Sequence, residues 1–137
     1  MSVEFEGLEN VLDALEELGD DSQLRQALGT ACALVERSAK QLAPKASGEL
    51  RRSITSKVEG GRGIVYTPLE YAPYVEFGTG LFAEKGGRKD VPWYYKDDEG
   101  EWHKTSGMHP QPFMRPALEQ NKEKIISILK EAIGSND

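Results

Sequence analysis

The sequence predicts an α+β fold, in which a small antiparallel β-sheet packs against two or three helices. Three observations predict it. Apolar residues recur at helical spacing near both ends of the chain, a central stretch alternates as strands do, and glycine-rich turns separate these segments. The expected order is two N-terminal helices, a hairpin, a long loop with a second hairpin, and a C-terminal helix. The 137 residues are enough for one core, so we expect a single domain over residues 1–137.

The first two elements are predicted to be helices that end near Gly19 and before Pro44. Ser22 is placed to cap the start of the second helix. Residues spaced by three and four positions form their apolar stripes, which are Leu8, Val11, Leu12, Leu15 and Leu18 in the first helix and Leu24, Leu28, Ala31, Val35, Ala39 and Leu42 in the second.

Residues 54–66 are predicted to form a β-hairpin. Ile54, Ser56 and Val58 alternate with polar neighbours, and a glycine-rich turn at residues 60–63 precedes the second strand at residues 64–66. The chain is expected to close with a helix in which Pro116 occupies the first turn, where its missing N–H costs nothing. The apolar stripe of that helix is Leu118, Ile125, Leu129 and Ala132.

Between these elements, residues 78–111 are predicted to form a long, flexible loop, rich in glycine and charge. Within it, VPWYYKDDEGEWHKT predicts a second hairpin, in which Trp93 and Tyr95 face Trp102 and Lys104 across the turn. Two strands alone are marginal in water, so this hairpin needs a surface to pack on. Trp93, Tyr95 and Trp102 are therefore a candidate contact with a neighbouring subunit.

Charge is unevenly distributed along the chain. The net charge of -6 argues against general affinity for nucleic acid or anionic membranes. Residues 1–21 hold eight acids and no base, whereas residues 36–62 hold seven bases and three acids. Such polarity could pair the acidic end of one subunit with the basic middle of another, or leave two solvated faces. The basic stretch 37–62 also supports an alternative function, a small nucleic-acid-binding or regulatory protein.

The sequence offers no complete catalytic, metal or cofactor pattern, so none is expected. Cys32 lacks an activating base, and His103 and His109 lack the partners of a zinc set. The acidic run at 97–101 lacks the alternating ligands of a calcium loop, and Gly78-Thr79-Gly80 lacks the Lys-Ser/Thr of a phosphate loop. Glu76 is expected to be a hydrogen-bonded structural carboxylate. A small enzyme with Glu76 or His109 in a pocket remains a third interpretation.

No apolar run approaches the roughly 18 residues that span a bilayer, and the acidic N-terminus does not resemble a secretory signal. The single Cys32 cannot form an internal disulfide, which agrees with a reducing compartment. The expected place of synthesis is the cytoplasm.

Three motifs, in the order APKASGELRRSI, YAPYVEFGTG and QPFMRPALE, resemble the Hong Kong 97-type tail-component family of tailed bacteriophages and prophages. The resemblance covers about residues 42–119. Ala46-Ser47-Gly48 stands where the family commonly has Thr-Gly. The matching residues are Pro44, Gly48, Leu50 and Ile54 in the first motif, Tyr71, Ala72, Val75, Glu76, Phe77, Gly78 and Thr79 in the second, and Pro112, Phe113, Arg115, Pro116 and Ala117 in the third.

The resemblance implies a structural virion protein without catalysis, acting in head–tail joining or tail completion as a ring subunit at the neck. Its implied partners are other copies in a hexameric ring, the head connector or adaptor, and tail-tube proteins, with DNA passing through the bore without specific binding. It implies assembly in the host cytoplasm and a final place in the virion neck or tail.

The resemblance also suggests roles for the motif residues. Residues 71–77 are expected to pack as a short turn or helix that Glu76 holds by hydrogen bonds. Gly78-Thr79-Gly80 is expected to release the chain into a loop that contacts the next subunit or ring. Glu76 and Arg115 are expected to form a structural ion pair.

Overall fold

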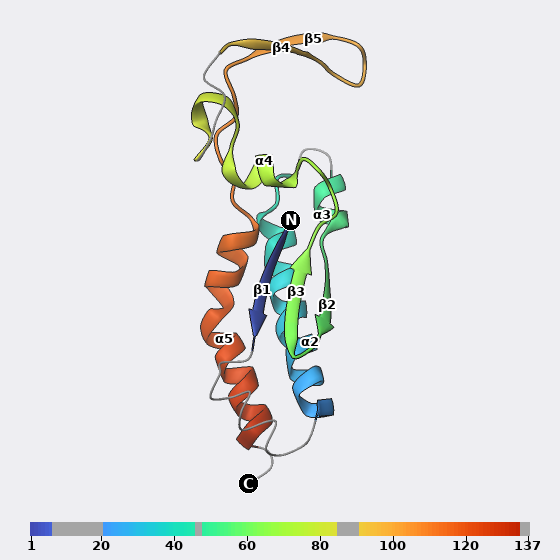
Figure 1. The fold of residues 1–137 in the computed structure, drawn as a ribbon, viewed down its shortest axis with the longest axis vertical. Coiled ribbons are helices and arrows are strands. Elements are labelled where there is room, and N and C mark those ends of the chain that lie inside the picture. Colours follow the sequence, from blue (N-terminus) through green and yellow to red (C-terminus); the bar gives the residue numbers. More distant parts are fainter. Residues whose placement is uncertain (7–20, 46–47, 85–90, 135–137) are drawn as a thin grey trace. The chain divides into compact units, whose positions relative to one another are not determined.

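The computed structural model describes residues 1–6, 21–45, 48–84 and 91–134. The chain divides into two compact units, unit 1 with residues 1–68 and 113–137 and unit 2 with residues 69–112 (Figure 1). The helices and antiparallel strands confirm the α+β class. The predicted helix over residues 8–18 lies outside the described residues, and the predicted loop at 78–111 falls within unit 2.

Unit 1 contains a three-stranded antiparallel sheet in the order β1-β3-β2. The predicted hairpin is confirmed as β2 (Thr55–Glu59) and β3 (Arg62–Tyr66). Gly60 and Gly61 join them with φ of 56° and 77°, the left-handed pair that a two-residue type I′ turn requires. A third strand, β1 (Ser2–Glu6), pairs with β3 and was not anticipated.

The two faces of this sheet differ in chemistry because side chains alternate along each strand. Val65 is fully buried and lies between Val3 and Ser56 in the register. The opposite face carries charges, with Arg62 Nη1 3.2 Å from Glu4 Oε2. α2 (Asp21–Leu42) packs against β2 and β3. A short helix, α3 (Glu49–Ser53), leads into β2.

The core of unit 1 lies largely between α2 and α5 (Met114–Gly134). Buried Asn121 of α5 ties this helix to α2, because its Nδ2 donates to Ser38 Oγ at 2.8 Å. The same amide also donates to Ala117 O, one turn earlier in α5, at 2.7 Å. The predicted stripe of α2 is confirmed at Leu24, Leu28, Ala31, Val35 and Ala39. Leu42 was assigned to that stripe wrongly and is 36% exposed. The next helical step from Ala39 is Ala43, which is buried instead.

Unit 2 contains α4 (Ala72–Phe77), a 3₁₀ turn η1 (Gly80–Phe82), and the strands β4 (Trp93–Lys96) and β5 (Trp102–Thr105). Helix α4 confirms the expected short turn or helix at residues 71–77, with Pro73 tolerated in its first turn. Strands β4 and β5 pair with each other in a two-stranded sheet. We call this sheet the ribbon.

Candidate functional site

Gly78-Thr79-Gly80 lies against the other chain segment at the base of the ribbon. Thr79 N–H donates to Met108 O, and Leu81 N–H donates to Ser106 O, each at 2.9 Å. Met108 N–H returns a hydrogen bond to Thr79 Oγ1 at 2.9 Å. We call this pairing of residues 78–81 with 106–108 the glycine clasp. It holds together the two segments that lead into and out of the ribbon.

Three glycines make this close approach possible. Gly78, Gly80 and Gly107 all have positive φ, at 83°, 61° and 127°. A Cβ on Gly78 would lie 2.9 Å from the carbonyl oxygens of both Phe82 and Met108, and a Cβ on Gly80 or Gly107 would overlap backbone oxygen. The Gly-Thr-Gly motif is therefore explained by backbone contact within unit 2. Gly107 has the same role, although no motif singled it out.

Helix α4 supports the clasp from the preceding residues. Gln111 N–H donates to Val75 O at 2.8 Å, and Glu84 N–H donates to Phe77 O at 2.9 Å. Ala72 and Glu76 are completely buried. Glu76 lies in unit 2 and Arg115 in unit 1, so the ion pair between them stays a prediction.

Four other motif residues have a visible place in the local structure. Gly48 adopts φ of 69° immediately before α3, in which Leu50 is buried. Phe113 is completely buried at the start of the segment that forms α5. Pro116 occupies the first turn of α5, as predicted. The motif residues thus belong to both units, and their role in assembly remains a prediction.

The ribbon differs from the predicted hairpin in its register. Trp93 pairs with Thr105 and Tyr95 pairs with His103, so the expectation that they face Trp102 and Lys104 is wrong. The turn explains the difference, because Asp97 N–H donates to Glu101 O and Gly100 takes φ of 86°. The loop therefore contains residues 98–100, and Trp102 aligns with Lys96.

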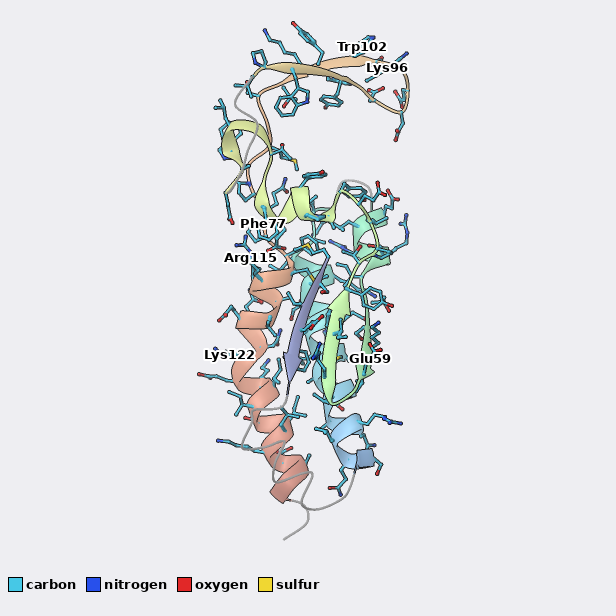
Figure 2. The ribbon with its side chains drawn as sticks, viewed as in Figure 1. Glu59, Phe77, Lys96, Trp102, Arg115 and Lys122 are labelled. Carbon is cyan, nitrogen blue, oxygen red and sulfur yellow. The ribbon has the colours of Figure 1, made fainter. Side chains whose placement is uncertain are left out.

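This register gives the ribbon two chemically distinct faces. One face holds Tyr94, Lys96, Trp102 and Lys104, and we call it the basic aromatic face. Tyr94 is 64% and Trp102 67% exposed, and Lys96 Nζ lies 6.0 Å from the centre of the Trp102 ring (Figure 2). The other face holds Trp93, Tyr95 and His103, with Tyr95 stacked on His103. The candidate contact residues Trp93, Tyr95 and Trp102 therefore do not share a face.

The turn of the ribbon gathers three possible metal ligands that the spacing argument did not anticipate. Ligand atoms of Asp97, Glu101 and His103 lie within 4.8 Å of one another. Both carboxylate oxygens of Asp97 already make polar contacts within the hairpin. Oδ1 accepts from Glu99 N–H at 2.9 Å and Glu101 N–H at 2.8 Å, and Oδ2 lies 2.6 Å from His103 Nε2. These hydrogen bonds, that of His103 foremost, lower the pKa of Asp97, which fits a turn-stabilising aspartate.

The other residues considered as catalytic or metal-binding groups, Cys32 and His109, are engaged in packing. Cys32 is buried beneath the sheet, and burial raises the pKa of its thiol, which disfavours the nucleophilic thiolate. His109 stacks on Phe82 with ring centres 3.8 Å apart.

A mostly apolar groove of unit 1 lies between β1 and α5, where Phe5, Ile125 and Leu129 line it. In the described part of the chain, no helix has the length and apolar character needed to cross a membrane.

Three of the seven bases in the stretch 37–62 are paired with acids in the described structure. Lys40, Lys57 and Arg62 lie 3.6, 3.3 and 3.2 Å from the carboxylates of Glu36, Glu59 and Glu4. Paired bases contribute less to phosphate binding, because the paired acid competes for them.

Comparison with models of protein families gives one match. Residues 6–78 match the HK97-gp10-like family, described as "Bacteriophage HK97-gp10, putative tail-component". The match covers α2, the hairpin β2–β3 and α4, and it ends at the first glycine of the clasp. No curated protein and no solved structure matches the chain.

Proposed function

Because this chain belongs to the HK97-gp10-like family of phage tail components, we propose that it is a structural virion protein that acts in head–tail joining or tail completion. In this proposal it performs no catalysis. It forms a closed ring of about six copies at the neck, between the head connector or adaptor and the tail tube. The family match is the observation that carries the proposal.

The structure supports an assembly role over a catalytic one through its exposed surface. Of the nine large hydrophobic side chains that are exposed among the described residues, eight belong to unit 2. Exposed apolar surface of this kind is typical of protein interaction sites. We therefore propose that unit 2 carries the contacts with neighbouring virion proteins, and that Trp93, Tyr95 and Trp102 take part in them.

The net charge of -6 agrees with a bore through which DNA slides, since a basic lining would hold phosphates. The proposed location is the host cytoplasm during assembly and the neck or tail of the finished virion. The alternative, a nucleic-acid-binding or regulatory protein that uses residues 37–62, is weakened by the salt bridges of Lys40, Lys57 and Arg62.

Deletion of the gene in the parent phage tests the proposal. We expect loss of infectivity, with free heads and separate or unfinished tails in electron micrographs, and recovery when the protein is supplied from a plasmid. Gold-labelled antibody should mark the neck of complemented particles. Normal infectivity after deletion, or absence of the protein from purified virions, would contradict the proposal.

The ring and its contact residues need a separate measurement. We expect purified tails that carry the protein to show about six copies per particle by quantitative mass spectrometry. Plasmid-borne Trp102→Ser should fail to complement, because it removes an exposed aromatic contact, whereas Leu42→Ser, which changes an exposed apolar residue of unit 1, should complement. Full complementation by Trp102→Ser would remove that residue from the proposed contact.

A further inference from the structure

The ribbon exposes two strand edges. Among the described residues, β4 and β5 pair only with each other, so each strand has one edge without a neighbouring strand (Figure 1). A free strand edge presents backbone N–H and C=O groups that can pair with a strand of another chain. A two-stranded sheet is also marginal on its own in water, so additional strands would stabilise the ribbon.

The hydrogen bonds of the ribbon show which backbone groups point outward. Asp97 N–H donates to Glu101 O at 2.8 Å, so these two residues form a hydrogen-bonded pair. Hydrogen-bonded pairs alternate with non-hydrogen-bonded pairs along antiparallel strands. The next pair in the register, Lys96 and Trp102, is therefore non-hydrogen-bonded. The N–H and C=O groups of Lys96, and of Tyr94 two positions earlier, point away from β5.

The edge of β4 is more accessible than the edge of β5. Just beyond β5, Ser106 O accepts from Leu81 N–H at 2.9 Å, so the glycine clasp lies along that edge. No backbone hydrogen bond between described segments uses the outward groups of Tyr94 or Lys96. Tyr94 and Tyr95 are 64% and 47% exposed, and Lys96 is exposed as well. An incoming strand therefore finds both backbone groups and side chains accessible at β4.

The sequence around β4 is complementary to itself in an antiparallel arrangement centred on Tyr95. When Tyr95 of two copies lie opposite each other, Tyr94 of each copy faces Lys96 of the other. Trp93 of each copy then faces Asp97 of the other. Outward-pointing residues meet outward-pointing residues, as hydrogen bonding between strands requires. Aromatic rings oppose each other or a lysine, and such cross-strand pairs stabilise a sheet.

The neighbouring registers of the same two strands are disfavoured. A shift of two residues in one direction places Lys96 opposite Lys96 of the second copy, and directly opposed like charges destabilise a sheet. A shift of two residues in the other direction places Lys96 opposite Pro92, which has no N–H to donate. A shift of one residue sets outward backbone groups against inward ones. The register centred on Tyr95 is therefore favoured.

We propose that two copies of this chain pair along β4, antiparallel and centred on Tyr95, and so join their ribbons into one four-stranded sheet. The contact is isologous, because the same strand contributes from both copies. It joins two copies and then stops, so it is distinct from the contacts that build a ring. The inference therefore goes beyond the proposed function and does not depend on it.

A single cysteine at the two-fold axis tests the register in the full-length protein. Tyr95 of the two copies would form a non-hydrogen-bonded pair, whose Cα atoms lie about 4.5 Å apart, a separation that suits a disulfide bond. We expect Tyr95→Cys to form a disulfide-linked dimer when the purified protein is oxidised with oxidised glutathione. Electrophoresis without reductant measures the dimer. Cys32 is 1% exposed and is present in every variant, so it adds the same background to each.

Tyr94→Cys is the matched control for this cross-link. Its Cα would lie about 7–8 Å from that of Tyr94 in the second copy, which is too far for a disulfide bond. It should therefore remain uncross-linked alone. An equimolar mixture of Tyr94→Cys and Lys96→Cys should form the dimer again, because these two positions face each other in the proposed register.

Proline substitution tests the backbone pairing itself. Lys96→Pro removes an N–H that points away from β5, so the ribbon should tolerate the change while pairing between copies is lost. We expect sedimentation to show a monomer–dimer equilibrium for the wild-type protein, which Lys96→Pro weakens by at least about tenfold. Lys104→Pro makes the same change at the edge of β5 and should leave the equilibrium unchanged. Tryptophan fluorescence checks that the ribbon of each variant is folded.

Four results would overturn the inference. They are a wild-type protein that stays monomeric at every concentration, a dimer that Tyr95→Cys does not cross-link, equal cross-linking by Tyr94→Cys, and equal weakening by the two proline variants. If Lys96→Pro fails to fold, the cross-link decides, because Tyr95→Cys leaves the backbone groups of the contact intact. Absence of the protein from virions would refute the proposed function alone.

Discussion

Gly80 shows how a single residue decides whether the clasp can close. Its φ of 61° disfavours any side chain, and a Cβ there would overlap Ser106 O. We expect Gly80→Ala to lower the unfolding free energy of unit 2 by about 2–4 kcal/mol, from the left-handed backbone and the overlap together. Both tryptophans lie in unit 2, so denaturant unfolding followed by tryptophan fluorescence reports on this unit.

Two other glycines serve as controls for this prediction. Gly60 lies in unit 1 and has φ of 56° with nothing near its Cβ position, so Gly60→Ala, followed by the helix signal at 222 nm, should lower the unfolding free energy by only the backbone contribution of about 1–2 kcal/mol. Gly29 lies within α2 with open space around it, and Gly29→Ala should stabilise the protein by about 0.5–1 kcal/mol. Equal effects of Gly80→Ala and Gly60→Ala would mean that the clasp contact contributes nothing.

Asn121 is a second residue on which packing depends. Its side-chain amide is buried and donates to Ser38 Oγ and to Ala117 O. We expect Asn121→Ala to lower the unfolding free energy of unit 1 by about 1–3 kcal/mol, and Ser38→Ala to lower it by less. Urea unfolding followed by the circular dichroism signal at 222 nm measures both changes. An unchanged urea midpoint for Asn121→Ala would contradict the bridging role.

At the scale of elements, the helices and strands that the sequence predicts are those whose residue pattern lies within one continuous segment. The apolar period of α2 and α5 and the alternation of β2 and β3 around Gly60-Gly61 all lie within one segment. Strand β1 was not predicted, because its partner β3 begins 56 residues after β1 ends. The segment SVEFE alone also carries no turn signal. The close backbone approach at Gly107 was not predicted for the same reason, since it is made with Thr79, which lies in a distant segment of the chain.

The ribbon turn should respond to pH through Asp97. Its hydrogen bonds to His103 and to two backbone N–H groups lower its pKa, so the stability they contribute is present at neutral pH. That stability is lost as the pH falls through the pKa of folded Asp97. We expect the wild-type protein to show an acid-dependent change in tryptophan fluorescence, and we expect Asp97→Asn to loosen the ribbon at pH 7 and to remove that change.

Asp98→Asn is the matched control for this change, because Asp98 is an exposed neighbour in the same turn. It should leave the fluorescence profile close to that of the wild-type protein. If Asp97→Asn retains the full acid transition, another group titrates and Asp97 does not hold the turn.

At the scale of the whole molecule, the two units share one chain that crosses between them twice, after Pro68 and before Phe113. Both crossings lie beside family motifs, one before the second motif and one within the third. The family match ends at Gly78, so the ribbon lies outside the matched residues.

The predicted ion pair between Glu76 and Arg115 would join these units. Glu76 is completely buried, so its carboxylate needs compensating partners. We expect Glu76→Gln to lower the thermal midpoint and to weaken assembly, and Arg115→Gln to do the same.

If the two side chains pair, the double variant should be no less stable than the worse single variant, with a coupling of about 1–3 kcal/mol. Tryptophan fluorescence reports on unit 2 and helix signal at 222 nm mainly on unit 1, so loss of the pair should separate the two transitions. Additive effects with coincident transitions would show that the two residues act independently.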